Sequence, residues 1–391
     1  MFMQRIKLQN ILSFGPDAQD LELKPLNVLI GPNGSGKSNL VEVIALLRAA
    51  PRDLTKPITQ GGGVGNWIWR GKTKASAAHV EVIVANADSS LVLRHRLAFA
   101  ETDYRIQLTD EQIAKEDQNS GRDEPSICFE LGADGPIFNG PIFNPDRNEK
   151  LTLFHYKRSQ SILSQIRDPF HHPELTWLGD MYPRIRPYRE WTFGRNAAPR
   201  EPQDAALPND FLTEGGQNLG LVLNRLKRDP VAKNRFLDAL RHLYEEVEDF
   251  DVIVEGGTVQ VMLQEGDITV PAVRLSDGTL RYLGLLAILC HPTPPPLVCI
   301  EEPEIGLHPD ILPGLAELLR EASQRCQLIV TTHSDILVDA LTDTPESVVV
   351  CEKENGQTTM KRFDKQELTG WLERYSLGDY WMRGGLGGTR W

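Results

Sequence analysis

The sequence lacks paired cysteines and long apolar runs. Its five cysteines are scattered along 391 residues, and none forms a CxxC pair. An odd, dispersed set on a long chain does not suggest a disulfide framework and fits a reducing compartment. No run of 18 apolar residues occurs, and charges interrupt residues 1–10, where a signal peptide needs an apolar stretch. We therefore expect a cytoplasmic protein with no membrane segment.

The chain also lacks an excess of basic residues and any heptad repeat. Its 42 Lys and Arg residues are outnumbered by 54 Asp and Glu residues, which gives a net charge of −12. This charge argues against a protein that coats nucleic acid with its whole surface, although it leaves room for a local basic patch. Without heptads, long coiled-coil arms are excluded. The remaining composition, 40% apolar and 25% charged, is that of a soluble globular protein.

A strand, a glycine loop and a helix follow one another near the N-terminus. Residues 26–30 are apolar, residues 31–38 read GPNGSGKS, and apolar residues then recur at helical spacing until Pro51. The loop matches the GxxxxGKS pattern in the context that this pattern requires. Backbone N–H groups of the loop would surround a β-phosphate, Lys37 would reach the β- and γ-phosphates, and Ser38 would bind Mg²⁺. The expected nucleotide-binding residues here are Asn33, Gly34, Ser35, Gly36, Lys37, Ser38 and Asn39.

Carboxylates and a histidine end two later strands. Glu301 and Glu302 follow an apolar strand at 297–300, and adjacent buried acids are costly unless a cation uses one of them. We expect Glu301 to bind Mg²⁺ and Glu302 to be the catalytic base that polarises the attacking water. His333 follows the next apolar strand, 328–331, at the edge where ligands bind in open α/β sheets. There it would contact the γ-phosphate or the water.

The motif LSDGT at residues 275–279 opens a predicted helix. Ser276 and Gly278 offer a hydroxyl and bare backbone N–H groups to an anion. The alternative is a plain helix cap, with Ser276 or Asp277 as the capping residue. The glycine loop, this motif, the Glu pair and the histidine follow one another in the expected order, which favours a role for LSDGT beyond capping.

Taken together, the four motifs resemble those of ABC-type ATPase heads of the RecF, SMC and OLD group. In this resemblance GPNGSGKS is Walker A, LSDGT the signature, VCIEEPE Walker B with its catalytic Glu, and TTHS the switch histidine. The start IKLQNILSFG and the tail WLERYSLGDYWMRGGLGGTRW are similar to those of short stand-alone bacterial members. The recognisable motifs cover residues 1–50 and 270–391.

The resemblance implies an α/β ABC-type P-loop head formed by both chain ends, with an inserted antiparallel β lobe and a helical lobe. We expect an N-terminal half at 1–165, an inserted lobe at 166–250 and a C-terminal half at 251–391. Two heads would enclose two ATP molecules, with Ser276 and Gly278 of one chain touching the γ-phosphate held by Lys37 of the other. A glutamine between the lobes would sense Mg²⁺, and Gln160 is the candidate, with Gln165 and Gln60 as alternatives.

The resemblance further implies an ATPase that hydrolyses ATP slowly and switches through an ATP-dependent homodimer or higher oligomer. Its expected setting is bacterial anti-phage defence or DNA transactions, together with a separately encoded nuclease or toxin effector. The alternatives are a RecF-like DNA-binding repair ATPase and an ATP-stabilised scaffold or sensor with little turnover. Two positions depart from the usual pattern: Glu301 replaces an Asp, and His308 stands where transporter ATPases carry an Asp, which argues against a transporter subunit.

Three further segments carry predictions. Residues 182–200 interleave arginines with aromatic residues, which fits either a nucleic-acid contact or an arginine-rich lobe surface. Asp229 and Pro230 predict a helix cap and first helical position. The tail, rich in glycine and containing Trp381 and Trp391, could dock a partner or cover the edge of the core.

Overall fold

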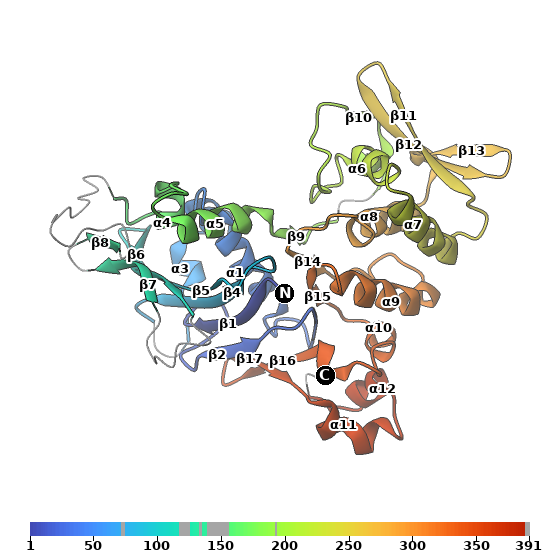
Figure 1. Ribbon diagram of the computed structural model, residues 1–391. Helices are drawn as coiled ribbons and strands as arrows, with labels where there is room; N and C mark the ends of the chain where they lie inside the picture. Colours follow the sequence, from blue (N-terminus) through green and yellow to red (C-terminus); the bar gives the residue numbers. More distant parts are fainter. Residues whose placement is uncertain (72–74, 117–125, 133–134, 139–155, 192–193, 388–391) are drawn as a thin grey trace.

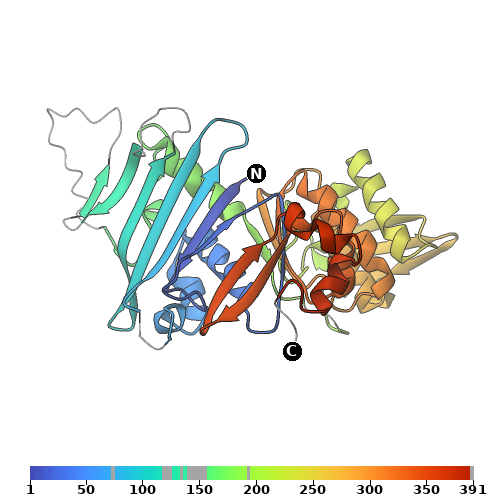
Figure 2. The same ribbon diagram turned by 90° about the horizontal axis from the view of Figure 1, so that it is seen from below.

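Three β-sheets form the framework of the protein (Figure 1). The structure, a computed structural model, describes residues 1–71, 75–116, 126–132, 135–138, 156–191 and 194–387. A six-stranded sheet lies between a seven-stranded antiparallel sheet and a small four-stranded sheet, as Figure 1 and the turned view in Figure 2 both show.

The six-stranded sheet combines strands from both ends of the chain. Its order is β17-β16-β3-β15-β14-β9, and β17 alone among these strands runs antiparallel to its neighbour. The predicted α/β head built from both chain ends is confirmed by this order. The strands are β3 (Leu26–Ile30), β9 (Arg186–Tyr188), β14 (Leu297–Glu301), β15 (Gln327–Thr331), β16 (Val348–Glu354) and β17 (Gln357–Arg362).

Each face of this sheet lies on a hydrophobic core of its own. In β3, Val28 and Ile30 join the core beneath helices α8 (Asp277–Leu289) and α9 (Leu312–Ser323). Leu29 points the other way, into the core that contains helix α1 (Lys37–Ala49). Because alternate residues serve opposite cores, the parallel strands are apolar throughout, as expected for a sheet covered on both sides.

Helix α1 packs between the six-stranded sheet and the antiparallel lobe, whose strand order is β2-β1-β4-β5-β6-β7-β8. This lobe is the predicted antiparallel insertion, and it also recruits the first two strands of the chain. Its strands are β1 (Met3–Gln9), β2 (Gln19–Glu22), β4 (Ala78–Ala85), β5 (Val92–Thr102), β6 (Arg105–Lys115), β7 (Ser126–Gly132) and β8 (Gly135–Phe138), with short helices α2 (Thr55–Gln60) and α3 (Val64–Trp67) nearby.

The middle segment, residues 166–250, contributes to both cores. Helix α5 (Pro173–Met181), like α4 (Ile162–Gln165) before it, buries leucines in the core of α1. Helices α6 (Leu219–Leu226) and α7 (Pro230–Leu243) pack in the core of α8. Asp229 accepts hydrogen bonds from two backbone N–H groups at the start of α7, which confirms the predicted cap. The small sheet comprises β10 (Gln203–Asp204), β11 (Asp249–Glu255), β12 (Thr258–Glu265) and β13 (Ile268–Pro271).

The C-terminal tail folds back onto the helix that follows the switch-histidine motif. Helix α12 (Leu377–Met382) packs against α10 (Asp335–Asp339), and α11 (Lys365–Leu372) lies beside α12. Trp381 is 1% exposed, so the described part of the tail covers the core edge. Trp391 lies outside the described residues. In the described part of the chain, no helix combines the length and apolar character needed to cross a membrane.

Replacing Trp381 with alanine should lower the free energy of unfolding by about 3–5 kcal/mol, because a fully buried indole leaves a large cavity. Trp371 is the matched control, since the residue is 49% exposed and its ring stacks on the ring of Tyr380. Trp371→Ala should cost about 1 kcal/mol or less. Urea titrations measure both values, and equal losses would show that the tail is not part of the core.

Candidate nucleotide site

The glycine loop lies between β3 and α1, as the sequence predicts. Gly31, Gly34 and Gly36 have positive φ angles of 142°, 77° and 100°. Two of these glycines also approach other atoms closely: a Cβ on Gly31 would lie 2.1 Å from the carbonyl oxygen of Cys351, and one on Gly36 would lie 2.2 Å from the hydroxyl of Thr358. The loop is thus seated on the hairpin of β16 and β17.

Side chains from distant parts of the chain brace the loop. The Thr358 hydroxyl lies 2.8 Å from the carbonyl oxygen of Ser35 and 2.6 Å from the Ser13 hydroxyl. Asn39, predicted as a nucleotide ligand, donates its side-chain amide to the Ser13 hydroxyl at 2.6 Å. Sequence reasoning missed Ser13 and Thr358, because they are 345 residues apart and no local pattern marks their contact.

Gly36→Ala should lower the free energy of unfolding by about 3 kcal/mol, because the added methyl group meets Thr358 and the positive φ is strained as well. Gly34→Ala is the matched control. Gly34 has positive φ but nothing within 4 Å of an added Cβ, so the cost should be about 1–2 kcal/mol. Denaturant unfolding separates the two effects, and equal losses would show that the close approach to Thr358 is unimportant.

Lys37 lies buried at the start of α1, with 6% exposure. Its ammonium group donates to the carbonyl oxygens of Gly31 at 2.8 Å and Pro32 at 3.0 Å. Burial lowers the pKa of this ammonium, while the nearby carboxylates, including Glu302, oppose the change. The loop therefore encloses a cation at the place where the sequence predicts phosphates.

Glu301 ends β14 next to the loop. Its Oε2 lies 3.4 Å from the Ser38 hydroxyl, so the structure brings the two predicted metal ligands together. Its Oε1 is buried and has no hydrogen-bond partner among the described residues. Burial raises the pKa of this carboxyl group to about 7, against the opposing charge of Arg189.

These ligands fit Mg²⁺, which prefers oxygen donors and is commonly bound by one or two carboxylates together with substrate phosphates. Glu301 offers an unpartnered carboxylate oxygen and Ser38 a hydroxyl. Within the described ranges, no group of three or more His, Cys, Asp or Glu residues could hold a metal by itself. A bound Mg²⁺ would therefore complete its coordination with waters and with oxygens of a nucleotide.

Glu302 has an unusual backbone conformation, with φ of 47°. A left-handed conformation at a residue other than glycine costs on the order of 1–3 kcal/mol and persists only when its surroundings enforce it. Here Arg281 donates to the Glu302 carbonyl at 2.5 Å, and Trp191 donates to the Glu301 carbonyl at 3.3 Å. The carboxylate of Glu302 comes within 3.6 Å of His333 Nε2, so the two predicted catalytic side chains face each other.

The signature segment begins α8. Ser276 accepts a hydrogen bond from the backbone N–H of Thr279 at 3.0 Å, so the capping interpretation is correct for this side chain. Gly278 lies against the turn after Walker B, where a Cβ would be 2.8 Å from the carbonyl oxygen of Gly306. Ser276 is exposed, and among the described residues no hydrogen bond joins it or Gly278 to the glycine loop of the same chain.

Gln160 is not part of this site. Its side-chain oxygen accepts from the backbone N–H of Leu54 at 3.0 Å, and its amide donates to Asp53 at 2.9 Å. Asp53 follows the C-terminal end of α1 and Ser38 begins the helix, so on the order of 20 Å separates them. The predicted metal-sensing role of Gln160 is therefore corrected: Gln160 connects α1 to the antiparallel lobe.

The alternative, Gln165, also has a structural role. It accepts from the backbone N–H of Lys157 at 2.9 Å and donates to the carbonyl of Gln160 at 3.0 Å. Chain order alone does not tell which end of α1 a loop approaches, so the sequence could not place Gln160 relative to the glycine loop.

Most arginines of segment 182–200 have structural partners. Arg200 contacts Asp277 and the Leu275 carbonyl, Arg186 lies over the ring of Phe211, and Arg189 lies 3.6 Å from Glu42. These contacts favour the lobe-surface interpretation. Arg184 and Arg195 are exposed, and Phe193 lies outside the described residues.

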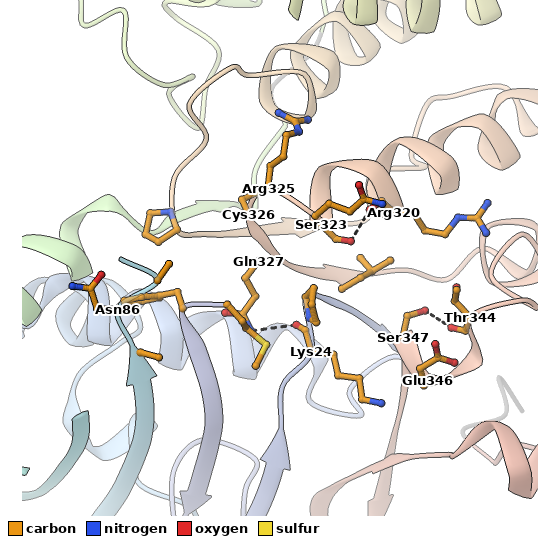
Figure 3. Close-up of a pocket in the computed structure, with 18 of the residues that line it drawn as sticks. Lys24, Asn86, Arg320, Ser323, Arg325, Cys326, Gln327, Thr344, Glu346 and Ser347 are labelled. Carbon is orange, nitrogen blue, oxygen red and sulfur yellow. Dashed lines mark hydrogen bonds between the residues drawn. The ribbon is translucent and has the colours of Figure 1, made fainter. Parts of the chain in front are cut away.

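A cavity of about 600 Å³ opens at the opposite edge of the sheet (Figure 3). Lys24, Pro296 and Gln327, which line it, lie at the starts of β3, β14 and β15. Five-residue strands are about 16 Å long, and ligands of such sheets bind at the carboxyl ends. The cavity is therefore separate from the nucleotide site.

Solved structures share this fold. The chain resembles an Smc head bound to the C-winged helix domain of ScpA, with 14% identity, a TM-score of 0.59 and coverage of 95% of this chain and 100% of that one. It also resembles the Smc head with an extended coiled coil bound to the C-terminal domain of ScpA from Pyrococcus furiosus, with 14% identity, a TM-score of 0.60 and coverage of 95% and 98%. A third is the Smc head with a coiled coil and joint from Pyrococcus yayanosii, with 12% identity, a TM-score of 0.52 and coverage of 95% and 99%.

The chain thus has the fold of an Smc head domain, with the glycine loop and the carboxylates at the same edge of the sheet. No curated protein matches the sequence. The family described as "AAA domain, putative AbiEii toxin, Type IV TA system" matches residues 26–339, and the chain belongs to it.

Proposed function

We propose that this protein binds ATP with Mg²⁺, hydrolyses it slowly and uses ATP to join two heads. The observation that carries the proposal is the convergence of four predicted residues at the carboxyl edge of the sheet. Ser38 faces Glu301 at 3.4 Å, and Glu302 faces His333 at 3.6 Å, beside the loop that contains Lys37.

The residues have distinct roles in this proposal. The N–H groups of the loop and the Lys37 ammonium bind the phosphates. Ser38 and Glu301 would hold Mg²⁺, which neutralises phosphate charge when bound. Glu302 accepts a proton from the attacking water, and His333 orients that water or the γ-phosphate.

Dimer formation follows from the position of the signature. Ser276 and Gly278 lie at the N-terminal end of a 13-residue helix, where backbone N–H groups favour an anion. Because no hydrogen bond among the described residues joins them to their own loop, we propose that they meet the γ-phosphate bound by a second copy. ATP would then join the two protomers.

The biological setting is also proposed here. The family description names a putative toxin of a type IV toxin–antitoxin system, and two of the similar Smc heads are bound to ScpA domains. We propose that the ATP-dependent dimer regulates a separately encoded effector in defence or DNA transactions.

Light scattering with and without Mg-ATP tests the proposal, repeated with double-stranded DNA. A mass that doubles from 43.9 kDa only with Mg-ATP would support the ATP-joined dimer. A shift caused by DNA would favour the repair function. A mass that does not change when ATP is added would favour the scaffold alternative and contradict ATP-dependent dimerisation.

A further inference from the structure

Glu304 lies two residues after Glu302, on the turn that follows β14. One of its carboxylate oxygens accepts two hydrogen bonds from the switch loop: from the Thr332 hydroxyl at 2.7 Å and from the backbone N–H of His333 at 2.8 Å. Its other oxygen is enclosed and has no hydrogen-bond partner among the described residues. Burying a carboxylate costs free energy, and these two hydrogen bonds offset part of that cost.

The contacts extend through the switch loop into α10. The Thr332 side chain is fully buried, and its hydroxyl also accepts from the backbone N–H of Ser334 at 3.0 Å. Ser334 in turn caps α10 by accepting from the N–H of Leu337 at 3.2 Å. The loop is therefore fixed on both sides of His333, and Glu304 supplies the fixed point on the strand side.

The same turn thus acts on His333 twice. Glu302 faces the imidazole at 3.6 Å, and Glu304 accepts a hydrogen bond from the backbone N–H of the same residue. Both carboxylates lie on one short turn, so this turn contacts His333 at its ring and at its backbone.

We propose that Glu304 is a positioning residue that sets the distance between His333 and Glu302 for ATP hydrolysis. This inference rests on the proposed function and adds to it a residue outside the four motif roles predicted from the sequence. Glu304 acts through hydrogen-bond acceptance, so an acceptor of the same shape should replace it.

The test uses the full-length protein and measures kcat, KM for ATP and the affinity of a fluorescent ATP analogue. Glu304→Ala should lower kcat by about tenfold or more, because small misplacement of a catalytic group is costly, and change ATP affinity by less than about threefold. Glu304→Gln, which keeps the accepting oxygen, should retain kcat within about threefold. Thr332→Val, which is similar in shape and removes one of the two bonds to Glu304 together with the bond from the Ser334 N–H, should lower kcat at least as much as Glu304→Gln does.

The double variant Glu304→Ala with His333→Ala decides between positioning and an independent role. If Glu304 acts through His333, the double variant should match His333→Ala alone, since removing the histidine removes what Glu304 positions. Multiplied losses, or a Gln variant as slow as the Ala variant, would overturn the proposal. Should Glu304→Ala fail to fold, Glu304→Gln and Thr332→Val still decide the question.

A readout that needs no turnover separates this inference from the proposed function. The ¹⁵N signals of the His333 ring, identified by their loss in His333→Ala, should shift in Glu304→Ala and stay unchanged in Glu255→Gln, an exposed site at the end of β11. A wild-type protein without ATPase activity would refute the proposed function. An unshifted His333 signal in Glu304→Ala would refute the positioning role.

Discussion

Lys37→Ala is expected to abolish measurable ATP hydrolysis and to weaken ATP binding by about 10- to 100-fold. The ammonium group is buried and directed into the glycine loop, where it contacts the Gly31 and Pro32 carbonyls. Hydrogen bonds to charged groups contribute about 1.5–3 kcal/mol, which corresponds to this range of affinity. Isothermal titration with ATP and a phosphate-release assay measure the two effects.

Lys7→Ala is the matched control for Lys37→Ala. Lys7 is an exposed lysine of β1, and its removal changes the net charge equally without touching the loop. Both variants should unfold at denaturant concentrations close to that of the wild type. Full ATPase activity in Lys37→Ala would contradict the nucleotide site itself.

Glu302→Gln is expected to slow hydrolysis by about 100- to 10,000-fold while leaving ATP binding intact, because an amide cannot accept the proton of the attacking water. Gln has nearly the shape of Glu, so the left-handed backbone should persist, together with the hydrogen bond from Arg281 to its carbonyl and the one that its N–H donates to the Thr331 carbonyl. Bound ATP should then accumulate unhydrolysed. The variant should become a stable dimer of twice 43.9 kDa when Mg-ATP is added.

Size-exclusion chromatography with light scattering measures this mass. Glu255→Gln, at the exposed end of β11, should behave as the wild type. A Glu302→Gln variant that binds ATP and stays monomeric would contradict ATP-joined dimerisation. One that still hydrolyses ATP at the wild-type rate would assign the base elsewhere.

The sequence predicted those parts of the site that lie in short continuous segments. The spacing of its residues identifies the glycine loop, and Glu301, Glu302 and His333 each follow an apolar stretch. Because parallel strands end at one edge, residues far apart in the chain could be expected to meet there. The α/β fold and its origin in both chain ends could be predicted for the same reason.

The supporting contacts could not be predicted. Arg281, Trp191 and Glu304 act on the backbone of neighbouring segments, and such contacts depend on three-dimensional packing that leaves no periodic trace. For the arginines of segment 182–200, the sequence left two interpretations open. Their composition suggests a ligand surface, whereas Arg186 and Arg200 have partners inside the protein.

The central position of β3 in the sheet determines how late in synthesis the chain can complete its fold. β3 leaves the ribosome early, yet its neighbours β15 and β16 begin at Gln327 and Val348, about 300 residues later. At roughly 5–20 residues per second, the strand waits about 15–60 s for its partners. During that interval the backbone N–H and C=O groups along both of its edges lack their native partners, which exposes the nascent chain to pairing with other strands. A chain that lacks about 50 residues after position 341 would contain the entire glycine motif but not the β16–β17 hairpin on which the glycine loop rests.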